Sequence, residues 1–268
     1  MEQKIWENIK KVRTISPLVH NITNYVVMNS SANALLAAGA SPVMAHAEEE
    51  VRDMVRIANS LVLNIGTLSK KWIDSMKIAL KEANRLGKAV ILDPVGAGAT
   101  IYRTETVKDL LNTGTVSVIR GNASEIMALV SAGFHTKGVE STETAGSAVE
   151  SAKLLQQKNK CIVCISGKID YILSQDEVVQ IHNGHEMMSR ITGMGCAATA
   201  LIGAFAGITN NYFEAAISGM ALMGVAGELA VKESSGPGSL QMHFFNKLYN
   251  LTSKDFFNTI KLQTEKYV

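Results

Sequence analysis

A pair of glycines before an apolar helix is the pattern in this sequence that points most directly to chemistry. Gly193 and Gly195 stand in the segment 192–196, and small and apolar residues at 197–205 follow them. The first turn of a helix has amide groups without intrahelical partners and carries the positive end of the helix dipole. Because glycine has no side chain, a phosphate can approach those amides closely. The segment predicts an anion-binding turn, although an ordinary tight turn has the same pattern.

Polar side chains with chemical use also follow three apolar runs that predict strands. Ligands bind at the carboxyl ends of the strands in open parallel sheets, so these side chains are expected to meet. Carboxylates suit a divalent metal, and a guanidinium suits a phosphate; with the glycine turn, these are the groups that phosphoryl transfer requires. The residues are Asp93 after the first run, Arg120, Asn122 and Glu125 after the second, and Ser166 after the third.

Each of these residues also has a simpler structural interpretation. Asp93 precedes Pro94 and could form a turn. Asn122 could cap the next helix, with Glu125 completing a capping box. Charges after Ser166, at positions 168 and 170, could be solvated in a hairpin. It is their shared position at predicted strand ends that favours a nucleotide-using enzyme.

The spacing of apolar residues predicts strands that alternate with helices from about residue 40 to residue 166. Runs that are apolar on both faces predict buried strands, and apolar residues three or four apart predict helices. This alternation indicates an α/β fold, with a central, mostly parallel sheet and helices on both faces. The strands are predicted at 60–66, 88–93, 116–120 and 161–166, and the helices at 70–86, 105–112, 123–131 and 144–157.

The rest of the chain departs from this alternation. A short amphipathic helix is expected over residues 1–13, a polar loop around 136–142, a hairpin of 171–174 with 177–182, and helices from there to the C-terminus. The 268 residues include only 4 prolines and show no linker, repeat or low-complexity segment. A single domain over residues 1–268 is therefore expected.

The composition limits the class of protein. The chain is 47% hydrophobic and 19% charged, its formal net charge is +2, and no stripe of Lys and Arg suggests nucleic acid. The apolar stretches 197–208 and 215–227 are too short and too rich in Gly and Ala to predict membrane spans. Three cysteines, an odd number, indicate a reducing compartment, and a cytoplasmic protein is expected. Cys161 and Cys164 should lie on opposite faces of one strand, where they cannot share a metal.

A series of motifs along the chain occurs together in one known family. The motifs are PLVHNITN at 17–24, GASPVM at 39–44, NIGTL at 64–68, DPVGA at 93–97, RGNASE at 120–125, NGH at 183–185, TGMGC at 192–196 and GPGS at 236–239. With these motifs in this order, the chain resembles the hydroxyethylthiazole kinase family of the ribokinase-like superfamily over essentially its whole length. The number and order of the matches make this resemblance specific.

The resemblance implies a ribokinase-like fold and a defined reaction. The reaction is ATP- and Mg²⁺-dependent phosphorylation of the primary alcohol of 4-methyl-5-(2-hydroxyethyl)thiazole, a salvage step of thiamine biosynthesis. It also implies a homotrimer with active sites between neighbouring subunits. By family pattern, Arg120, Ser166 and Asn122 are assigned to ATP, Asp93 and Glu125 to Mg²⁺, Met44, Gly193 and Asn24 to the thiazole, and Cys196 with Gly193 and Gly195 to catalysis.

Two positions bear on how far the resemblance extends. Ribokinase-like kinases usually have an Asp, the base for the alcohol proton, where this chain has Cys196. The thiazole kinases characteristically have Cys there, so Cys196 supports the family while weakening the assignment of a strong base. The helix N-terminus is expected to lower the pKa of this thiol, and the charge of ATP to oppose that change. The family often has Thr where this chain has Ser166, and the hydroxyl is kept.

The adenine pocket is less defined by the sequence. Its walls are expected from the C-terminal helices, where Gly219, Gly224 and Gly227 would leave room for a flat ring.

Other functions are considered beside this one. They are a hydroxymethylpyrimidine or pyridoxal kinase of the same superfamily, an ATP-dependent dehydratase of a hydrated nicotinamide cofactor, and a binding protein without turnover. Cys196 and the segment 21–24 argue against the other kinases, and the dehydratase lacks the N-terminal motifs. Retention of Asp93, Arg120 and Glu125 argues against a binding protein.

Overall fold

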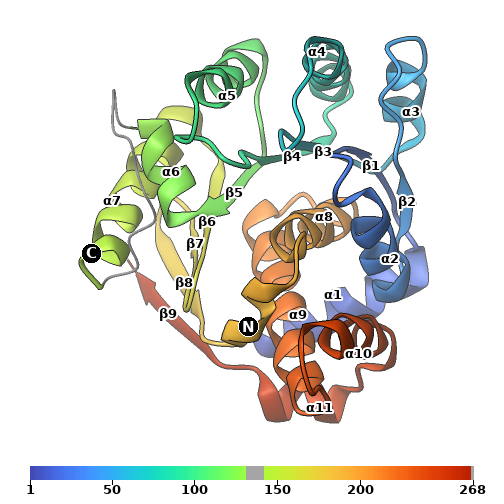
Figure 1. The fold of residues 1–268 in the computed structure, drawn as a ribbon, viewed down its shortest axis with the longest axis vertical. Helices are drawn as coiled ribbons and strands as arrows, with labels where there is room; N and C mark the ends of the chain where they lie inside the picture. The colour runs from blue at the N-terminus through green and yellow to red at the C-terminus, as the bar shows by residue number, and fades with distance from the viewer. Residues whose placement is uncertain (131–141, 267–268) are drawn as a thin grey trace.

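A central sheet lies between two layers of helices in the computed structural model, which describes residues 1–130 and 142–266 (Figure 1). Within these residues the sheet has nine strands in the order β2-β1-β3-β4-β5-β6-β7-β8-β9. The strands from β2 to β6 pair in parallel, and those from β6 to β9 pair antiparallel. Their bounds are β1 (Leu18–Ile22), β2 (Ser41–Val43), β3 (Ser60–Asn64), β4 (Ala89–Asp93), β5 (Val118–Asn122), β6 (Ile162–Ser166), β7 (Asp170–Leu173), β8 (Glu177–Ile181) and β9 (Leu262–Lys266).

Helices cover both faces of this sheet, which confirms the predicted α/β fold (Figure 1). One layer contains α3 (Val51–Ile57), α4 (Lys70–Arg85), α5 (Ile101–Thr113), α6 (Ala123–Val130) and α7 (Thr142–Asn159). The other layer contains α1 (Glu2–Ile15), α2 (Met28–Ala38), α8 (Met194–Ala206), α9 (Tyr212–Val231), α10 (Pro237–Asn250) and α11 (Ser253–Thr259), and a short 3-10 helix, η1 (Glu186–Arg190), precedes α8.

The two layers enclose separate hydrophobic cores, one on each face of the sheet. Neighbouring residues of a strand point to opposite faces, so each parallel strand contributes to both cores. Cys164 belongs to the core beneath α8 and α9, and Cys161 to the core beneath α7. The predicted separation of these two cysteines onto opposite faces is confirmed, and both are free thiols.

Helix α8 packs closely on the centre of the sheet because a glycine lets it approach. A Cβ atom at Gly203 would lie 2.7 Å from Val62 Cγ2 and 3.0 Å from Val19 Cγ1, on β3 and β1. The Ser60 hydroxyl donates a hydrogen bond of 2.7 Å to the Gly203 carbonyl. These contacts fix α8 along the strands, so that its N-terminal turn meets their carboxyl ends.

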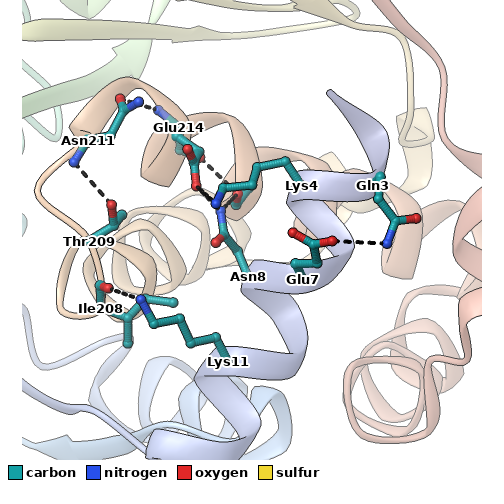
Figure 2. A network of polar contacts seen from close by, with 10 residues as sticks. Gln3, Lys4, Glu7, Asn8, Lys11, Ile208, Thr209, Asn211 and Glu214 are labelled. Carbon is teal, nitrogen blue, oxygen red and sulfur yellow. Dashed lines mark hydrogen bonds and ion pairs between the residues drawn. The ribbon is translucent and has the colours of Figure 1, made fainter.

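Helix α1 holds the connection between α8 and α9 from outside (Figure 2). Asn8 donates hydrogen bonds to the Glu214 carboxylate at 2.6 Å and to the Ser218 hydroxyl at 3.1 Å. The Lys11 ammonium donates to the Ile208 carbonyl at 2.8 Å.

Helix α9 is long and apolar enough to cross a membrane by length and composition alone, yet most of it is buried in the protein.

Three strands were not predicted from the sequence, and each has a physical reason. Strand β1 contains buried polar residues, His20 and Asn21, so it does not read as an apolar run. Strand β2 has three residues, and one of them is Pro42. Strand β9, with the sequence LQTEK, lies at the edge of the sheet and is the exception in a C-terminal part that was expected to be nearly all helix. The polar loop expected around 136–142 and the predicted helix end at 131 lie outside the described residues, except for Thr142, which begins α7.

Candidate active site

The predicted site residues lie in a row along the carboxyl ends of the parallel strands. Neighbouring strands are about 4.8 Å apart, so the row from β2 to β6 spans about 24 Å. The first turn of α8 lies over its centre, because Gly195 packs against Arg120 of β5 and Cys196 lies beside Asn24, which follows β1. In sheet order, the row consists of Met44 after β2, Asn24 after β1, Asp93 in β4, Arg120 and Asn122 in β5, and Ser166 in β6.

Asp93 is the buried centre of this row. Its side chain is 1% exposed, and one carboxylate oxygen, Oδ2, accepts hydrogen bonds from Asn64 Nδ2 and Thr199 Oγ1, each at 2.8 Å. The other oxygen, Oδ1, has no hydrogen-bond partner among the described residues. Burial raises the pKa of this carboxyl to about 6, and the nearby Arg120 guanidinium opposes part of that rise. An unpaired carboxylate oxygen in a buried position is suited to a cation.

Arg120 joins the part of the row that is predicted to bind the nucleotide, here called the nucleotide side, to the first turn of α8. The side chain is 8% exposed, and Nη2 donates a hydrogen bond of 2.5 Å to the Ser166 hydroxyl. A Cβ atom at Gly195 would lie 2.6 Å from Nη1, so only glycine lets the guanidinium occupy this position. The Nε atom has no partner among the described residues. The arrangement brings the predicted ATP residues Arg120 and Ser166 together beneath the glycine turn.

Asn122 and Glu125 form a capping box at the start of α6, as the simpler interpretation predicted. The Asn122 amide donates to Glu125 Oε2 at 2.8 Å, and the Glu125 amide donates to Asn122 Oδ1 at 2.9 Å. The other Glu125 oxygen, Oε1, accepts from the Gly96 amide at 2.8 Å. Glu125 therefore ties the glycine-rich loop after β4 to the end of β5, and it lies close enough to contribute to the raised pKa of Asp93.

The pair Asp93 and Glu125 fits a magnesium ion that is held mainly by phosphates. Within residues 1–130 and 142–266, no group of three or more His, Cys, Asp or Glu side chains is arranged to hold a metal. Protein sites for Mg²⁺ often supply one or two carboxylates and leave the other positions to water and substrate phosphates. The free Oδ1 of Asp93 meets that requirement.

Gly193 is required by both backbone conformation and space. It stands before α8 with φ of 86°, in the left-handed region that favours glycine. A Cβ atom here would lie 2.8 Å from Val27 Cγ1 and 3.1 Å from Ser30 Oγ. The first turn of α8 contains no acidic residue. Its amides are thus free of a competing carboxylate from the same turn, as an anion site requires.

Cys196 lies on the Asn24 side of the same turn, which is predicted to bind the acceptor alcohol and is here called the acceptor side. Its thiol is half-buried, and Asn24 Nδ2 lies 3.7 Å from Sγ in hydrogen-bonding geometry. Burial raises the pKa of the Cys196 thiol to about 12, and the nearby Asp93 contributes to the rise. The lowering effect considered for the helix N-terminus does not decide this pKa, because desolvation outweighs the helix dipole here. The thiol is neutral at pH 7.

The two other residues predicted to lie on the acceptor side, Asn24 and Met44, have uncharged side chains. Asn24 is 4% exposed and also donates to Asn64 Oδ1 at 2.8 Å. Met44 is half-buried at the end of β2, next to β1 in the sheet. Met44 and Ser166 lie at opposite ends of the row, so they do not share one binding position.

Two residues that hold Asp93 were not assigned a role from the sequence. Asn64 connects Asn24 to Asp93 through its own side-chain amide. Thr199, one turn into α8, donates to the same carboxylate. The polar side chain of Asn64 within the apolar run predicted as a strand at 60–66 was a usable signal for it. Nothing in the apolar helix pattern around Thr199 indicated a contact across to β4.

The glycines expected to make room for adenine fill a different need. Cβ atoms at Gly219, Gly224 and Gly227 would lie within 3.0 Å of Ile202, Asn183 and Met188, respectively. They let α9 pack against the protein, so the expectation of space for a ring beside them was wrong.

A groove of about 660 Å³ lies at the amino ends of β4–β6, opposite the row, and none of the predicted site residues lines it.

Comparison with known proteins places the chain in one family. It matches the "Hydroxyethylthiazole kinase family" over residues 9–254. It is 53% identical to a hydroxyethylthiazole kinase of Syntrophus aciditrophicus (strain SB) over 262 residues, which are 97% of each protein. It is 54% identical to one of Oleidesulfovibrio alaskensis over 251 residues, which are 94% of each.

Solved structures agree with this placement. The hydroxyethylthiazole kinase protein from Pyrococcus horikoshii OT3 has a TM-score of 0.89 and 41% identity, covering 98% of this chain and 99% of that one. A pyridoxal kinase from Staphylococcus aureus, solved with AMP-PCP and pyridoxal, has a TM-score of 0.65 at 17% identity, covering 94% of this chain and 99% of that one, and shares the fold. The chain belongs to the hydroxyethylthiazole kinase family.

Proposed function

We propose that the protein transfers the γ-phosphoryl group of ATP to the primary hydroxyl of 4-methyl-5-(2-hydroxyethyl)thiazole, a step of thiamine salvage. One observation carries the proposal beyond family membership. Adjacent residues in the first turn of α8 face the two sides of the row: Gly195 packs against Arg120, and Cys196 lies beside Asn24. A phosphoryl group held by this turn would lie between a nucleotide and an acceptor alcohol.

On the nucleotide side, Arg120, Ser166 and Asn122 bind the phosphates of ATP in this proposal. The Nε–H group of the guanidinium and its N–H groups that do not contact Ser166 can donate charge-assisted hydrogen bonds to phosphate oxygens. The amides of the α8 turn donate to the transferred group, and the positive end of the helix dipole stabilises its charge. Gly195 keeps these two sets of donors close together.

Asp93 and Glu125 would hold Mg²⁺ in this proposal. When bound, the ion neutralises charge on the phosphates and aligns them for transfer. Asp93 contributes its unpaired oxygen, and Asn64 and Thr199 fix the orientation of its carboxylate.

On the acceptor side, Met44, Gly193 and Asn24 would bind the thiazole alcohol. Cys196 does not act as a thiolate, because its raised pKa keeps the thiol protonated at pH 7. The transition state of phosphoryl transfer is loose, so the alcohol proton can leave late, and a strong base gains little. The thiol orients the hydroxyl through a hydrogen bond, while the turn and Arg120 stabilise the charge.

We further infer one domain over residues 1–268, a cytoplasmic location and a homotrimer whose sites need residues of two chains. Free cysteines and a net charge of +2 support the location. Tyr25 and Val26, which follow Asn24 directly, are 65% and 61% exposed, and such apolar exposure beside a site suits a second copy. Light scattering at micromolar concentration tests the homotrimer; a fully active monomer would contradict it.

The proposed reaction is tested by a coupled assay of ADP release. The purified protein is given ATP and Mg²⁺ with the thiazole alcohol, and in parallel with a hydroxymethylpyrimidine and with pyridoxal. The proposal requires the thiazole alcohol to give the highest kcat/KM. Preference for either other alcohol, or no release with any of them, would refute it.

A further inference from the structure

The backbone that follows β2 is held by side chains rather than by the sheet. Strand β2 ends at Val43, and residues 44–47 form neither helix nor strand. Met44 stands at the start of this segment, which we call the Met44 loop. Because no ladder of backbone hydrogen bonds extends along it, other contacts must fix its position.

The first of these contacts comes from His20, in the middle of β1. The imidazole is 0% exposed, and Nε2 lies 2.8 Å from the Ala45 carbonyl oxygen. A carbonyl only accepts, so Nε2 must carry the proton. Burial lowers the pKa of His20, which keeps the ring neutral, and Nδ1 therefore has a lone pair with no partner among the described residues. The ring makes one hydrogen bond, and it holds the peptide next to Met44.

The second contact is an aromatic stack from the same loop. The His46 ring lies parallel to the Trp72 indole, with centroids 4.0 Å apart. Tyr25 packs edge-on against the same indole at 4.6 Å. Tyr25 follows Asn24, so the stack joins the Met44 loop to the loop that carries Asn24. The relative position of these two acceptor-side residues is thus determined through Trp72.

We propose that His20 is a positioning residue for the acceptor alcohol. It fixes the Ala45 carbonyl, and with it the backbone on which Met44 stands, at the distance from Asn24 that a small apolar heteroaromatic alcohol requires. The proposal rests on the proposed function, because that function assigns Met44 and Asn24 to the acceptor. In this proposal, the buried His20 contacts neither ATP nor the alcohol, and its replacement weakens the binding of the alcohol only.

The test compares H20Q with H20N. A Gln amide nitrogen reaches about as far as Nε2 and can donate to the Ala45 carbonyl, whereas an Asn amide reaches only the position of Nδ1. H20N should raise the KM for the thiazole alcohol about tenfold, because a buried carbonyl loses its donor. The KM for ATP should stay within about twofold of wild type in both variants, and H20Q should recover most of the loss.

A matched control and a second variant keep the test decisive. S218A removes another buried side-chain hydrogen bond, from Asn8, in α9, and should leave both KM values unchanged. H46A removes the half-buried outer ring of the stack without altering a strand, and should raise the KM for the alcohol about threefold. Melting temperatures are measured for all four variants.

Several results would overturn the proposal. In a folded variant these are an unchanged KM for the alcohol in H20N or H46A, an equal rise for ATP, or no recovery in H20Q. If H20N does not fold, H46A decides the question. Absence of thiazole turnover by the wild-type protein would refute the proposed function, and this inference with it. Normal wild-type turnover with an unaffected H20N would refute the inference alone.

Discussion

The two sides of the active-site row are built from different kinds of group. On the proposed nucleotide side, Arg120, Asp93 and Glu125 have ionisable side chains, and hydrogen bonds with the backbone and with neighbouring polar side chains hold them in place. On the acceptor side, the contacts are those of Asn24 and of the neutral His20, together with stacked rings. In the proposed function, the first arrangement suits the charges of a triphosphate, and the second suits an uncharged heteroaromatic alcohol.

Unpaired buried polar atoms occur on both sides, but their consequences differ. Asp93 Oδ1 and Arg120 Nε belong to charged groups that are ready for charged partners. Their desolvation is unfavourable until a ligand binds. In the ligand-free protein, these groups of the nucleotide side therefore lower the free energy of unfolding. The unpaired atoms of His20 and Trp72 on the acceptor side belong to neutral rings, for which that cost is smaller. Substitutions should therefore alter activity and stability in opposite directions mainly on the nucleotide side.

The largest effect is expected for Asp93→Asn. An Asn can keep an oxygen for Asn64 and Thr199 and place its amide nitrogen where Oδ1 is unpaired. It loses the charge for Mg²⁺, and kcat should fall about a thousandfold, at the upper end for one electrostatic group. Steady-state kinetics at saturating ATP measure this. A loss below tenfold would remove Asp93 from the nucleotide side.

The same variant should be more stable than wild type at neutral pH. Burial raises the pKa of Asp93 from 3.8 to about 6, so the folded protein binds this proton more tightly than the unfolded chain. The contribution of Asp93 to the free energy of unfolding therefore falls as pH rises from about 4 to about 6, by up to about 3 kcal/mol. Denaturant unfolding without Mg²⁺ should show that the free energy of unfolding of D93N rises relative to that of wild type as pH rises over this range. A constant difference would contradict the shift.

A second large effect is expected for Gly195→Ala. The new methyl group would lie 2.6 Å from Arg120 Nη1, so the guanidinium or the turn must move. Misplaced donors commonly reduce rate by about a hundredfold, and kcat/KM for ATP should fall by that order. Gly238→Ala, where nothing lies within 4 Å, is the matched control and should remain active. Equal losses in the two variants would show that α-helical glycine substitutions act through folding alone.

Arg120→Ala should weaken ATP binding by about ten- to a hundredfold, because a charge-assisted contact to phosphate is lost. Binding of the thiazole alcohol should change little, since Arg120 lies on the other side of the turn from Asn24. Calorimetry with each ligand separates the two. If both affinities fell equally, the division of the row into two sides would be wrong.

The sequence was sufficient for much of the fold and for the nucleotide side. Continuous apolar runs predicted β3 to β6, and the residues at their ends were the polar groups that now lie in the row. Asp93, Arg120 and Ser166 lie where a parallel sheet must bring them, because strand ends meet at one edge. Their roles toward ATP and Mg²⁺ stay predictions.

The sequence was less informative wherever long-range packing decides. The neutral thiol of Cys196 follows from burial and from Asp93, and neither is visible in a helix pattern. The glycines of α9 looked like space for a ring, but side chains such as Met188 occupy that space. His20 lies in a strand whose polar residues concealed it, and its partner Ala45 is 25 residues away. Contacts between residues so far apart in the sequence produce no local periodicity from which they could be predicted.

A smaller effect is expected at Cys196. Because burial raises the pKa of the thiol to about 12, the thiol keeps its proton at neutral pH and cannot accept one from the alcohol, so Cys196→Ala should lose about tenfold in kcat and stay active. Cys196→Asp should be at least as fast as wild type at neutral pH. The nearby Asp93 raises the pKa of an acid at this position, so the advantage should grow from pH 6 to pH 8. A variant no better than Cys196→Ala, with both ligands bound normally, would mean that the proton leaves by another route.

The smallest effect is expected for Glu125→Gln, where two functions of one carboxylate can be separated. A Gln keeps a single acceptor oxygen, so either the Asn122 amide or the Gly96 amide loses its partner. Loss of the cap should lower the free energy of unfolding by about 1 kcal/mol, independently of Mg²⁺. Loss of charge should weaken the affinity for Mg²⁺, so a rate defect of about fivefold should shrink as Mg²⁺ is raised. Asn122→Ala breaks the same capping box and leaves the charge in place, so its defect should not respond to Mg²⁺. If the two variants respond alike, Glu125 acts only as a cap, and Asp93 alone supplies the carboxylate on the nucleotide side.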